Sequence, residues 1–166
     1  MARLFVAVWP PAHVVDRIDA LVRGSEEPLR FTATDTLHIT LRFFGEAAID
    51  DVTRALDDVA FPPAPARLGP TVSVMNGRIV IIPVAGLSAL ATVVTRSTAG
   101  IGDAARDDFV GHITLARLRR DAPVPRIVGT RFGVEFDVDE LALVSSRLTP
   151  TGAIYETITR WPVVSE

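Results

Sequence analysis

Cysteine is absent from the sequence. Its absence excludes disulfide bonds, thiolate catalysis, thiolate zinc sites and iron–sulfur clusters, and it fits a reducing cytoplasm. Long hydrophobic runs are absent too, because the apolar stretch over residues 4–9 ends at Pro10 and Pro11. Such a stretch is too short for a signal peptide or a membrane span. We therefore expect a cytoplasmic protein that does not enter a membrane.

An excess of positive charge is also missing, since the net charge is −3. This balance argues against a protein that coats nucleic acid by bulk charge, although a cleft with a few local cations could still hold one phosphate. Hydrophobic residues make up 48% of the chain and charged residues 22%, which suffices for a buried core. With 166 residues, we expect one domain, or two small lobes that share a core.

Hydrophobic periodicity predicts a mixture of strands and helices. Alternating patterns predict strands over residues 3–9, 37–44, 71–75, 78–84, 111–118, 131–138, 140–148 and 153–161, and helical spacing predicts helices over 14–22, 49–59 and 87–98. Asn76-Gly77 predicts a tight hairpin, and the proline-rich segment 61–70 predicts a linker. The mixture of hairpins and helical connections favours an α+β fold with largely antiparallel sheets.

Two of the predicted strands carry nearly the same motif. Leu37-His38-Ile39-Thr40-Leu41 recurs as Gly111-His112-Ile113-Thr114-Leu115. On a strand, residues i and i+2 point to the same face, so each motif presents one imidazole and one hydroxyl together. Two copies across a cleft would supply a general acid, a general base and two hydroxyl donors around one anion. A phosphodiester needs this set for its hydrolysis.

Two other interpretations of the histidines stay open. A single histidine on a strand is more often structural than catalytic, but the duplication favours a catalytic pair. Histidine is also a common metal ligand, yet no third histidine or carboxylate cluster accompanies His38 and His112 in the sequence. His13 begins the first predicted helix without a threonine partner, so we expect it at the surface.

The chain resembles the RNA 2',3'-cyclic phosphodiesterases, or 2'-5' RNA ligase-like proteins, of the two-histidine phosphoesterase superfamily. The resemblance runs nearly end to end, through RLFVAVWPP, LHITLRFFGE, GHITLARL and LALVSSRLTPTGAIYETITRWPV. It implies a single two-lobed domain over 1–166, with a pseudo-two-fold arrangement of antiparallel sheets around a central cleft and helices outside. It also implies hydrolysis of a terminal 2',3'-cyclic phosphate to a 2'-phosphate, without a cofactor.

The resemblance also implies roles for single residues. His38 and His112 would be catalytic, with His38 the acid toward the leaving 3'-oxygen and His112 the base toward water. Thr40 and Thr114 would bind the phosphate. Arg117 would assist them, although its odd offset from His112 requires a twist, a bulge or its long side chain to bring it to the cleft. Arg42 has the strand parity of His38, so it could add positive potential, or it could face solvent.

Three departures from the family pattern concern the substrate's surroundings. Gly111 replaces the usual proline before the second histidine. The aromatic residue before the first motif is matched by Phe31, which can stack a base but lacks an indole donor. The tryptophan of the strand after the linker is replaced within residues 78–82. Tyr155 could contact substrate, or lie in the core or on the rim.

The sequence thus leaves three functions to distinguish. The first is metal-independent hydrolysis of an RNA 2',3'-cyclic phosphate, with 2'-5' RNA ligation as a possible side activity. The second keeps the site but acts on a small cyclic nucleotide or ADP-ribose cyclic phosphate. The third is a non-catalytic RNA-end binding module, which the presence of all four motif residues argues against. In each case we expect a monomer that binds an RNA 3' end or a nucleotide cyclic phosphate, without metal or cofactor.

Overall fold

The computed structural model describes residues 1–25 and 27–164, which form three α-helices, one short 3-10 helix and nine strands. The strand order is β7-β3-β5-β6-β2-β1-β8-β9, with β4 added beside β5, and every pair is antiparallel. The expected α+β fold with antiparallel sheets is therefore confirmed. The strands are β1 (Ala2–Val8), β2 (Ile39–Ala47), β3 (Pro65–Leu68), β4 (Ser73–Met75), β5 (Ile79–Ala85), β6 (His112–Arg117), β7 (Val134–Asp137), β8 (Glu140–Thr149) and β9 (Gly152–Pro162).

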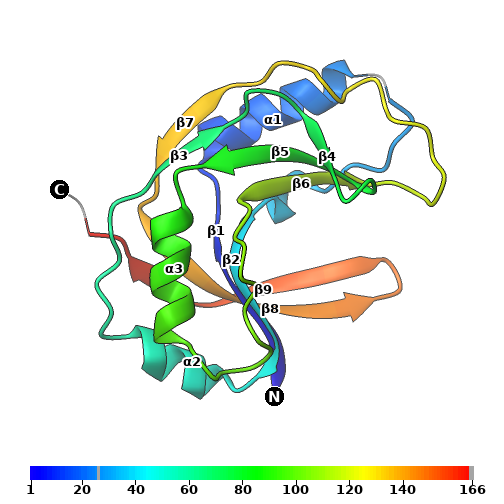
Figure 1. Cartoon of the computed structure of the whole chain (residues 1–166). Coiled ribbons are helices and arrows are strands. Elements are labelled where there is room, and N and C mark those ends of the chain that lie inside the picture. The colour runs from blue at the N-terminus through cyan, green and yellow to red at the C-terminus, as the bar shows by residue number, and fades with distance from the viewer. Residues whose placement is uncertain (26, 165–166) are drawn as a thin grey trace.

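The helices divide between two lobes. They are α1 (Ala12–Gly24), α2 (Ile49–Leu56) and α3 (Ser88–Ser97), with the 3-10 helix η1 at Thr34–Thr36. Helix α1 contacts β7 beside the β3–β5 lobe, whereas α3 packs on β2 and contacts α2 (Figure 1). The lobes meet at β2 and β6, which pair through Ile39 and Ile113. This seam joins the two motif strands.

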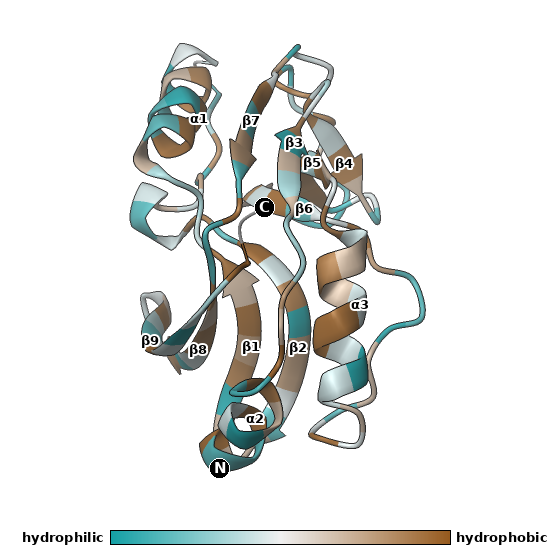
Figure 2. Cartoon of the chain, turned by 90° about the vertical axis from the view of Figure 1, so that its left-hand side faces the viewer, coloured by the Kyte–Doolittle hydropathy of each residue, from teal (hydrophilic) through white to brown (hydrophobic). Residues whose placement is uncertain are grey.

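The core lies between the sheet and the helices. Alternation in β1 sends Leu4, Val6 and Val8 into the main core, where each is at most 1% exposed. Phe5 and Ala7 point to the opposite face and form a second, smaller cluster with residues of β8. Figure 2 shows hydrophobic colouring along most of β1, and alternating hydrophobic and hydrophilic colouring on β2 and the helices. Both faces of β1 are thus covered, which makes it a rigid support for the neighbouring strand β2.

Two predicted connections behave differently in the structure. Asn76 and Gly77 form the predicted tight hairpin between β4 and β5, with φ of 54° and 69°. The predicted linker 61–70, however, contains strand β3, which lies between β5 and β7. Its alternate residues Ala66 and Leu68 are buried. Pro65 is its first residue, where strands tolerate a proline, so the proline content concealed a short strand.

Candidate active site

The structure brings the two motifs together on one face of the seam. Ile39 pairs with Ile113, and both are fully buried in the core. In antiparallel pairing, one step along each strand sets His38 beside Thr114, and Thr40 beside His112. These four side chains are half-buried on the opposite face. Diagonal neighbours in such a pair lie about 7–8 Å apart, a separation that leaves room for one phosphate between the two imidazoles.

Both imidazoles are held by the same backbone device. Nδ1 of His38 lies 2.8 Å from the carbonyl oxygen of Thr36, and Nδ1 of His112 lies 2.8 Å from that of Val110. A carbonyl oxygen only accepts, so Nδ1 carries a proton in each ring. Nε2 is then the atom that changes protonation state, as a base when neutral and as an acid when charged. Thr36 ends the helix η1, which the sequence did not predict.

The surroundings of His38 are aromatic. Its ring centroid lies 5.0 Å from that of Phe5, 5.3 Å from Tyr155 and 5.7 Å from Trp9. Burial lowers the pKa of His38, the hydrogen bond to the Thr36 carbonyl opposes this, and the charge of His112 lowers the pKa further. Tyr155 is therefore a rim aromatic in contact with the first histidine. The strand pattern of residues 3–9 places Phe5, Ala7 and Trp9 on one face. Ala7 pairs with Thr40 of the first motif, so this face carries the rings that contact His38.

A β-bulge places Arg117 on the cleft face. In β5, Val80 and Ile81 are consecutive, but their partners in β6 are Ala116 and Thr114, so Leu115 is an extra residue. The bulge returns Arg117 to the face of Thr114, in spite of its odd offset from His112. Arg117 is exposed, and within the described part of the chain it has no hydrogen bond or ion pair. Its guanidinium can thus meet an anion in the cleft.

The same kind of bulge turns the Arg42 side chain toward the core face, where protein acceptors occupy its guanidinium. This arrangement corrects the predicted phosphate contact. Val6 and Ala7 pair with Arg42 and Thr40, so Leu41 is the extra residue and Arg42 points to the face opposite Thr40. Arg42 is 5% exposed. It donates to the carbonyls of Thr98, Ile101 and Asp103 at 2.6, 2.9 and 3.0 Å, and to the Thr98 hydroxyl at 2.5 Å. It anchors the loop that leads from α3 toward His112.

Phe31 does not lie where a base-stacking residue is needed. It forms an isolated bridge with Ala116, which is buried, and its side chain packs against the main core. Paired residues of neighbouring strands point to the same face, so the half-buried ring of Phe31 lies on the core side with Ala116 rather than on the side of Arg117. This position argues against nucleobase stacking by Phe31, which stays a prediction from the sequence.

Gly111 is closely packed. Its carbonyl accepts a hydrogen bond from the Val84 amide at 2.9 Å. A Cβ atom at Gly111 would lie 2.4 Å from the carbonyl oxygen of Val84. The exchange of proline for glycine before His112 therefore lets β5 approach this segment directly, and the entry to the strand is held by that pairing.

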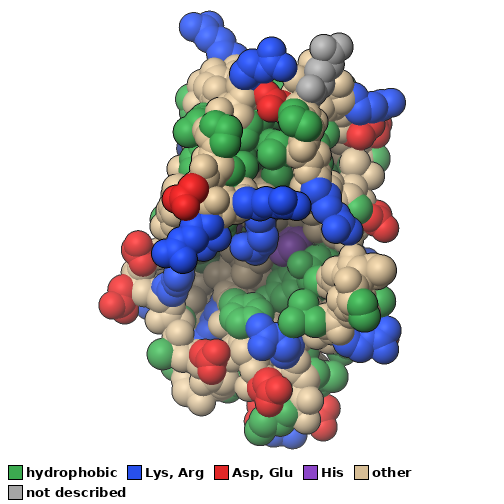
Figure 3. All heavy atoms as spheres, turned by 90° about the vertical axis from the view of Figure 1, so that its right-hand side faces the viewer, with side chains coloured by type: hydrophobic (Ala, Val, Ile, Leu, Met, Phe, Trp, Pro, Cys, Tyr) green, Lys and Arg blue, Asp and Glu red, His purple; other side chains and the backbone are tan. Residues whose placement is uncertain are grey.

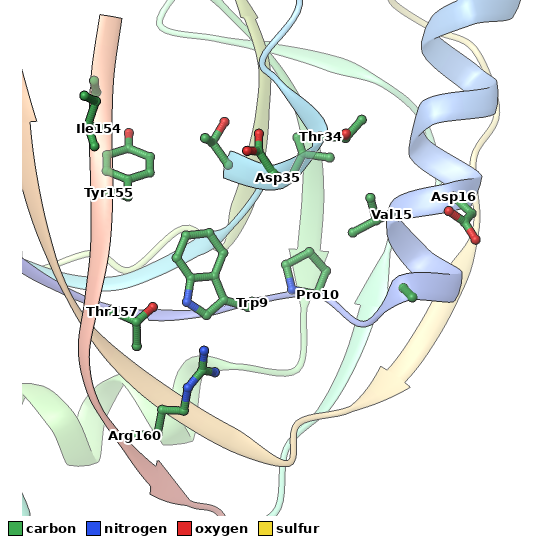
Figure 4. A pocket seen from close by; sticks show the side chains of 14 residues that line it. Trp9, Pro10, Val15, Asp16, Thr34, Asp35, Ile154, Tyr155, Thr157 and Arg160 are labelled. Carbon is green, nitrogen blue, oxygen red and sulfur yellow. The ribbon is translucent and has the colours of Figure 1, made fainter. Parts of the chain in front are cut away.

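Two cavities flank the histidine pair. A cavity of about 520 Å³ contains Thr40 and His112 of the two motifs. Its lining also includes two aromatic residues, two arginines, two aspartates and the tip of the β4–β5 hairpin: Phe43, Phe109, Arg42, Arg106, Asp103, Asp108, Met75 and Asn76. A larger cavity of about 780 Å³ contains neither motif histidine, but shares Trp9 and Tyr155 with the surroundings of His38. Figure 4 shows the side chains that line it, from the end of β1, from α1, from η1 and from β9. We take the smaller cavity as the reaction site, because it holds motif residues.

The charge around the histidines differs from the net charge of the chain. Figure 3 shows a histidine in a recess, with arginine side chains gathered next to it and most of the visible acidic side chains farther away. All the basic residues are arginines, since the sequence contains no lysine. Arginine side chains thus border this recess although the net charge of the chain is −3.

Residues 1–25 and 27–164 contain neither a metal-binding cluster nor a membrane-spanning helix. No group of three or more histidine, cysteine, aspartate or glutamate side chains there could hold a metal ion. No helix of this part is long and apolar enough to cross a membrane.

The chain is similar to proteins of known name over nearly its whole length. The chain is 29% identical to an RNA 2',3'-cyclic phosphodiesterase of Archaeoglobus fulgidus, over 93% of its own length and 96% of the relative's. It is 24% identical to a protein of the same name from Methanocaldococcus jannaschii, over 96% and 99%. Among solved structures, E. coli LigT complexed with 3'-AMP superposes with a TM-score of 0.80 at 26% identity, covering 99% of each chain.

The family comparison covers most of the chain. A protein described as a crystal structure of a phosphoesterase superposes with a TM-score of 0.82 at 25% identity, again over 99% of both chains. The model of the 2'-5' RNA ligase superfamily matches residues 10–149, which include both motifs. With its two bulged His-x-Thr strands joined at one seam, the chain belongs to the 2'-5' RNA ligase superfamily.

Proposed function

We propose that this protein hydrolyses the terminal 2',3'-cyclic phosphate of RNA to a 2'-phosphate, without a metal ion. The observation that carries this proposal is the paired placement of His38 and His112 on one face of the seam, each with Nδ1 bound to a carbonyl. A second support is the name of the two relatives, RNA 2',3'-cyclic phosphodiesterase. The pair supplies an acid and a base without help from a Lewis acid.

The reaction follows from the two imidazoles. His112 takes a proton from water through Nε2, and the water oxygen attacks phosphorus. The bond from phosphorus to the 3'-oxygen breaks, and His38 gives its Nε2 proton to that oxygen. One water is consumed, the product carries a 2'-phosphate and a 3'-hydroxyl, and proton exchange with solvent restores both rings. Removal of such an acid or base typically costs about 10²–10⁴-fold in rate.

The remaining cleft residues stabilise the charge that develops on the phosphate. Thr40 and Thr114 have no hydrogen bond for their hydroxyls within the described residues, so both can donate to non-bridging oxygens. Arg117 adds a cation on the same face. Hydrogen bonds that involve a charged partner are worth about 1.5–3 kcal/mol each. The phosphate charge also favours the protonated form of His38, which offsets the effect of burial on its pKa.

The arginines beside the histidine recess favour an RNA end over a small cyclic nucleotide. A strand carries further phosphates beyond the cyclic one, and these gain from the surrounding positive charge. A non-catalytic binding module would not need Nε2 of both histidines free of protein partners. Among the described residues neither Nε2 atom has a hydrogen bond, which favours the enzyme.

One assay tests the proposal. Purified protein is incubated in EDTA with a short RNA that ends in a 2',3'-cyclic phosphate, and in parallel with a cyclic mononucleotide. We expect conversion to the 2'-phosphate, seen as the gain of one water in the product mass, with the RNA turned over more efficiently. Absence of turnover, or a loss in EDTA that added divalent metal restores, would contradict it.

A further inference from the structure

We propose that Phe43 is a base-stacking residue, whose ring takes the nucleobase of the nucleotide that presents its cyclic phosphate to the histidines. This inference rests on the proposed function and adds a contact that determines substrate preference. It also gives a different answer from the sequence, which indicated Phe31.

The bulge in β2 determines where Phe43 points. Phe43 pairs with Phe5 and Thr40 pairs with Ala7, so Phe43 and Thr40 share the cleft face. Phe43 thereby occupies, after the first motif, the place that Arg117 occupies after the second. At about 3.3 Å per residue, it lies within about 10 Å of Thr40. A ribose separates a phosphate from its base, so a base can reach this ring while the phosphate stays at the threonine.

The exposure of Phe43 is unusual for its position. It is 43% exposed, although its neighbours Arg42 and Phe44 are buried. Among the large exposed hydrophobic residues in the described part of the chain, it is the aromatic one. It lines the 520 Å³ cavity together with Phe109, Val110 and the catalytic His112. Exposed apolar surface in a concave site marks a ligand contact rather than a packing contact.

Arg3 completes this contact. Its guanidinium carbon lies 5.3 Å from the centroid of the Phe43 ring, within the range of a cation–π interaction. Arg3 pairs with Glu46 of β2 in the ladder, so it approaches the ring from the neighbouring strand. A ring held in this way loses little freedom when a base stacks on it. Stacking accepts every base, and we expect purines, with their larger rings, to bind more tightly.

The experiment compares Phe43→Leu with Phe31→Leu. Phe31 is the control, because it undergoes the same substitution but packs against the core beside β6. Each variant is assayed with adenosine 2',3'-cyclic phosphate and with glycerol 1,2-cyclic phosphate, which has no base. We expect Phe43→Leu to raise KM for the adenosine substrate about 5- to 100-fold, with the base-free substrate unchanged. Phe31→Leu should leave the ratio between the two substrates unchanged, and Phe43→Trp should keep KM at or below the wild-type value.

Two outcomes would overturn the inference. One is an unchanged KM for the adenosine substrate in Phe43→Leu, and the other is an equal loss on both substrates, which would indicate a role in shaping the site. Titration calorimetry with adenosine 2'-monophosphate separates this inference from the proposed function, because it needs no turnover. Weaker binding by Phe43→Leu, with Phe31→Leu unchanged, supports stacking even if no cyclic phosphate is hydrolysed. No binding by the wild-type protein overturns it.

Discussion

The two motif strands share one backbone design but have different neighbours. In each, a leucine after the threonine is the bulged residue, and the histidine Nδ1 is bound to the carbonyl two residues earlier. His38 is enclosed by three aromatic rings, whereas His112 opens onto a cavity. The repeated backbone holds both imidazoles in the same way. In the mechanism that we propose, both rings act on one phosphate, and their different neighbours distinguish the acid from the base.

The residues that follow the two bulges also share a backbone arrangement but differ in their side chains. The residue that turns to the core face is Arg42 after the first motif and Ala116 after the second. The residue that returns to the cleft face is Phe43 after the first and Arg117 after the second. The arginine of the first half is therefore an internal anchor, whereas the arginine of the second half is exposed on the cleft face. Substitutions at these positions test whether the two halves differ in this way.

The largest effect is expected from the histidines. His38→Ala and His112→Ala should each lower turnover of a cyclic-phosphate substrate by about 10²–10⁴-fold, because each removes a proton-transfer group. Steady-state rates measure the loss, and circular dichroism checks that both variants fold. Near wild-type turnover in either variant would refute the paired mechanism.

Arg42 should matter for stability. Arg42→Met leaves the carbonyls of Thr98, Ile101 and Asp103 without their donor, and a buried unpaired acceptor costs about 1–3 kcal/mol. We expect the free energy of unfolding to fall by about 2–4 kcal/mol in urea denaturation. A change below about 0.5 kcal/mol, the usual range of a surface substitution, would show that the loop holds without this anchor.

Arg117 is the matched contrast. Arg117→Met removes an exposed cation, so the free energy of unfolding should change by no more than about 0.5 kcal/mol. Turnover should fall by about 10- to 100-fold, because the phosphate loses one charge-assisted hydrogen bond. The two methionine variants, assayed side by side, should separate stability from activity. Destabilisation by Arg117→Met with normal turnover would reverse the assignment.

The smallest effect concerns pH and stability. Burial lowers the pKa of His38 in the folded chain below its unfolded value of about 6.5. The unfolded chain then binds more protons, so this contribution to stability is complete above that value and is lost as pH falls toward the folded pKa. Urea denaturation between pH 7.5 and 5.5 should show a decline that is smaller in His38→Gln. An equal decline in both proteins would speak against a buried, neutral His38.

Much of the architecture could be predicted from sequence, because it follows from periodicity. The alternating strands, the Asn76-Gly77 hairpin and the shared face of each His-x-Thr pair need only local rules. The bulges at Leu41 and Leu115 could not be predicted, because a bulge is fixed by the register with a distant strand. Each bulge adds one residue and so reverses the face to which the following side chains point. Simple strand alternation therefore placed Arg42 on the wrong face and did not explain how Arg117 reaches the cleft. The rings around His38 come from β1, from Trp9 just after it, and from β9, which only the folded chain brings together.

The claim that the two histidines transfer protons in opposite directions has one direct test. In His112→Ala only His38 remains, and as the acid it must be protonated, so residual turnover should fall as pH rises past its lowered pKa. In His38→Ala only His112 remains, and as the base it must be neutral, so residual turnover should rise with pH. Rates of the double alanine variant are subtracted at each pH to remove catalysis by hydroxide. Opposite slopes in this order are the predicted result, and slopes of the same sign in both variants would contradict the acid–base pair.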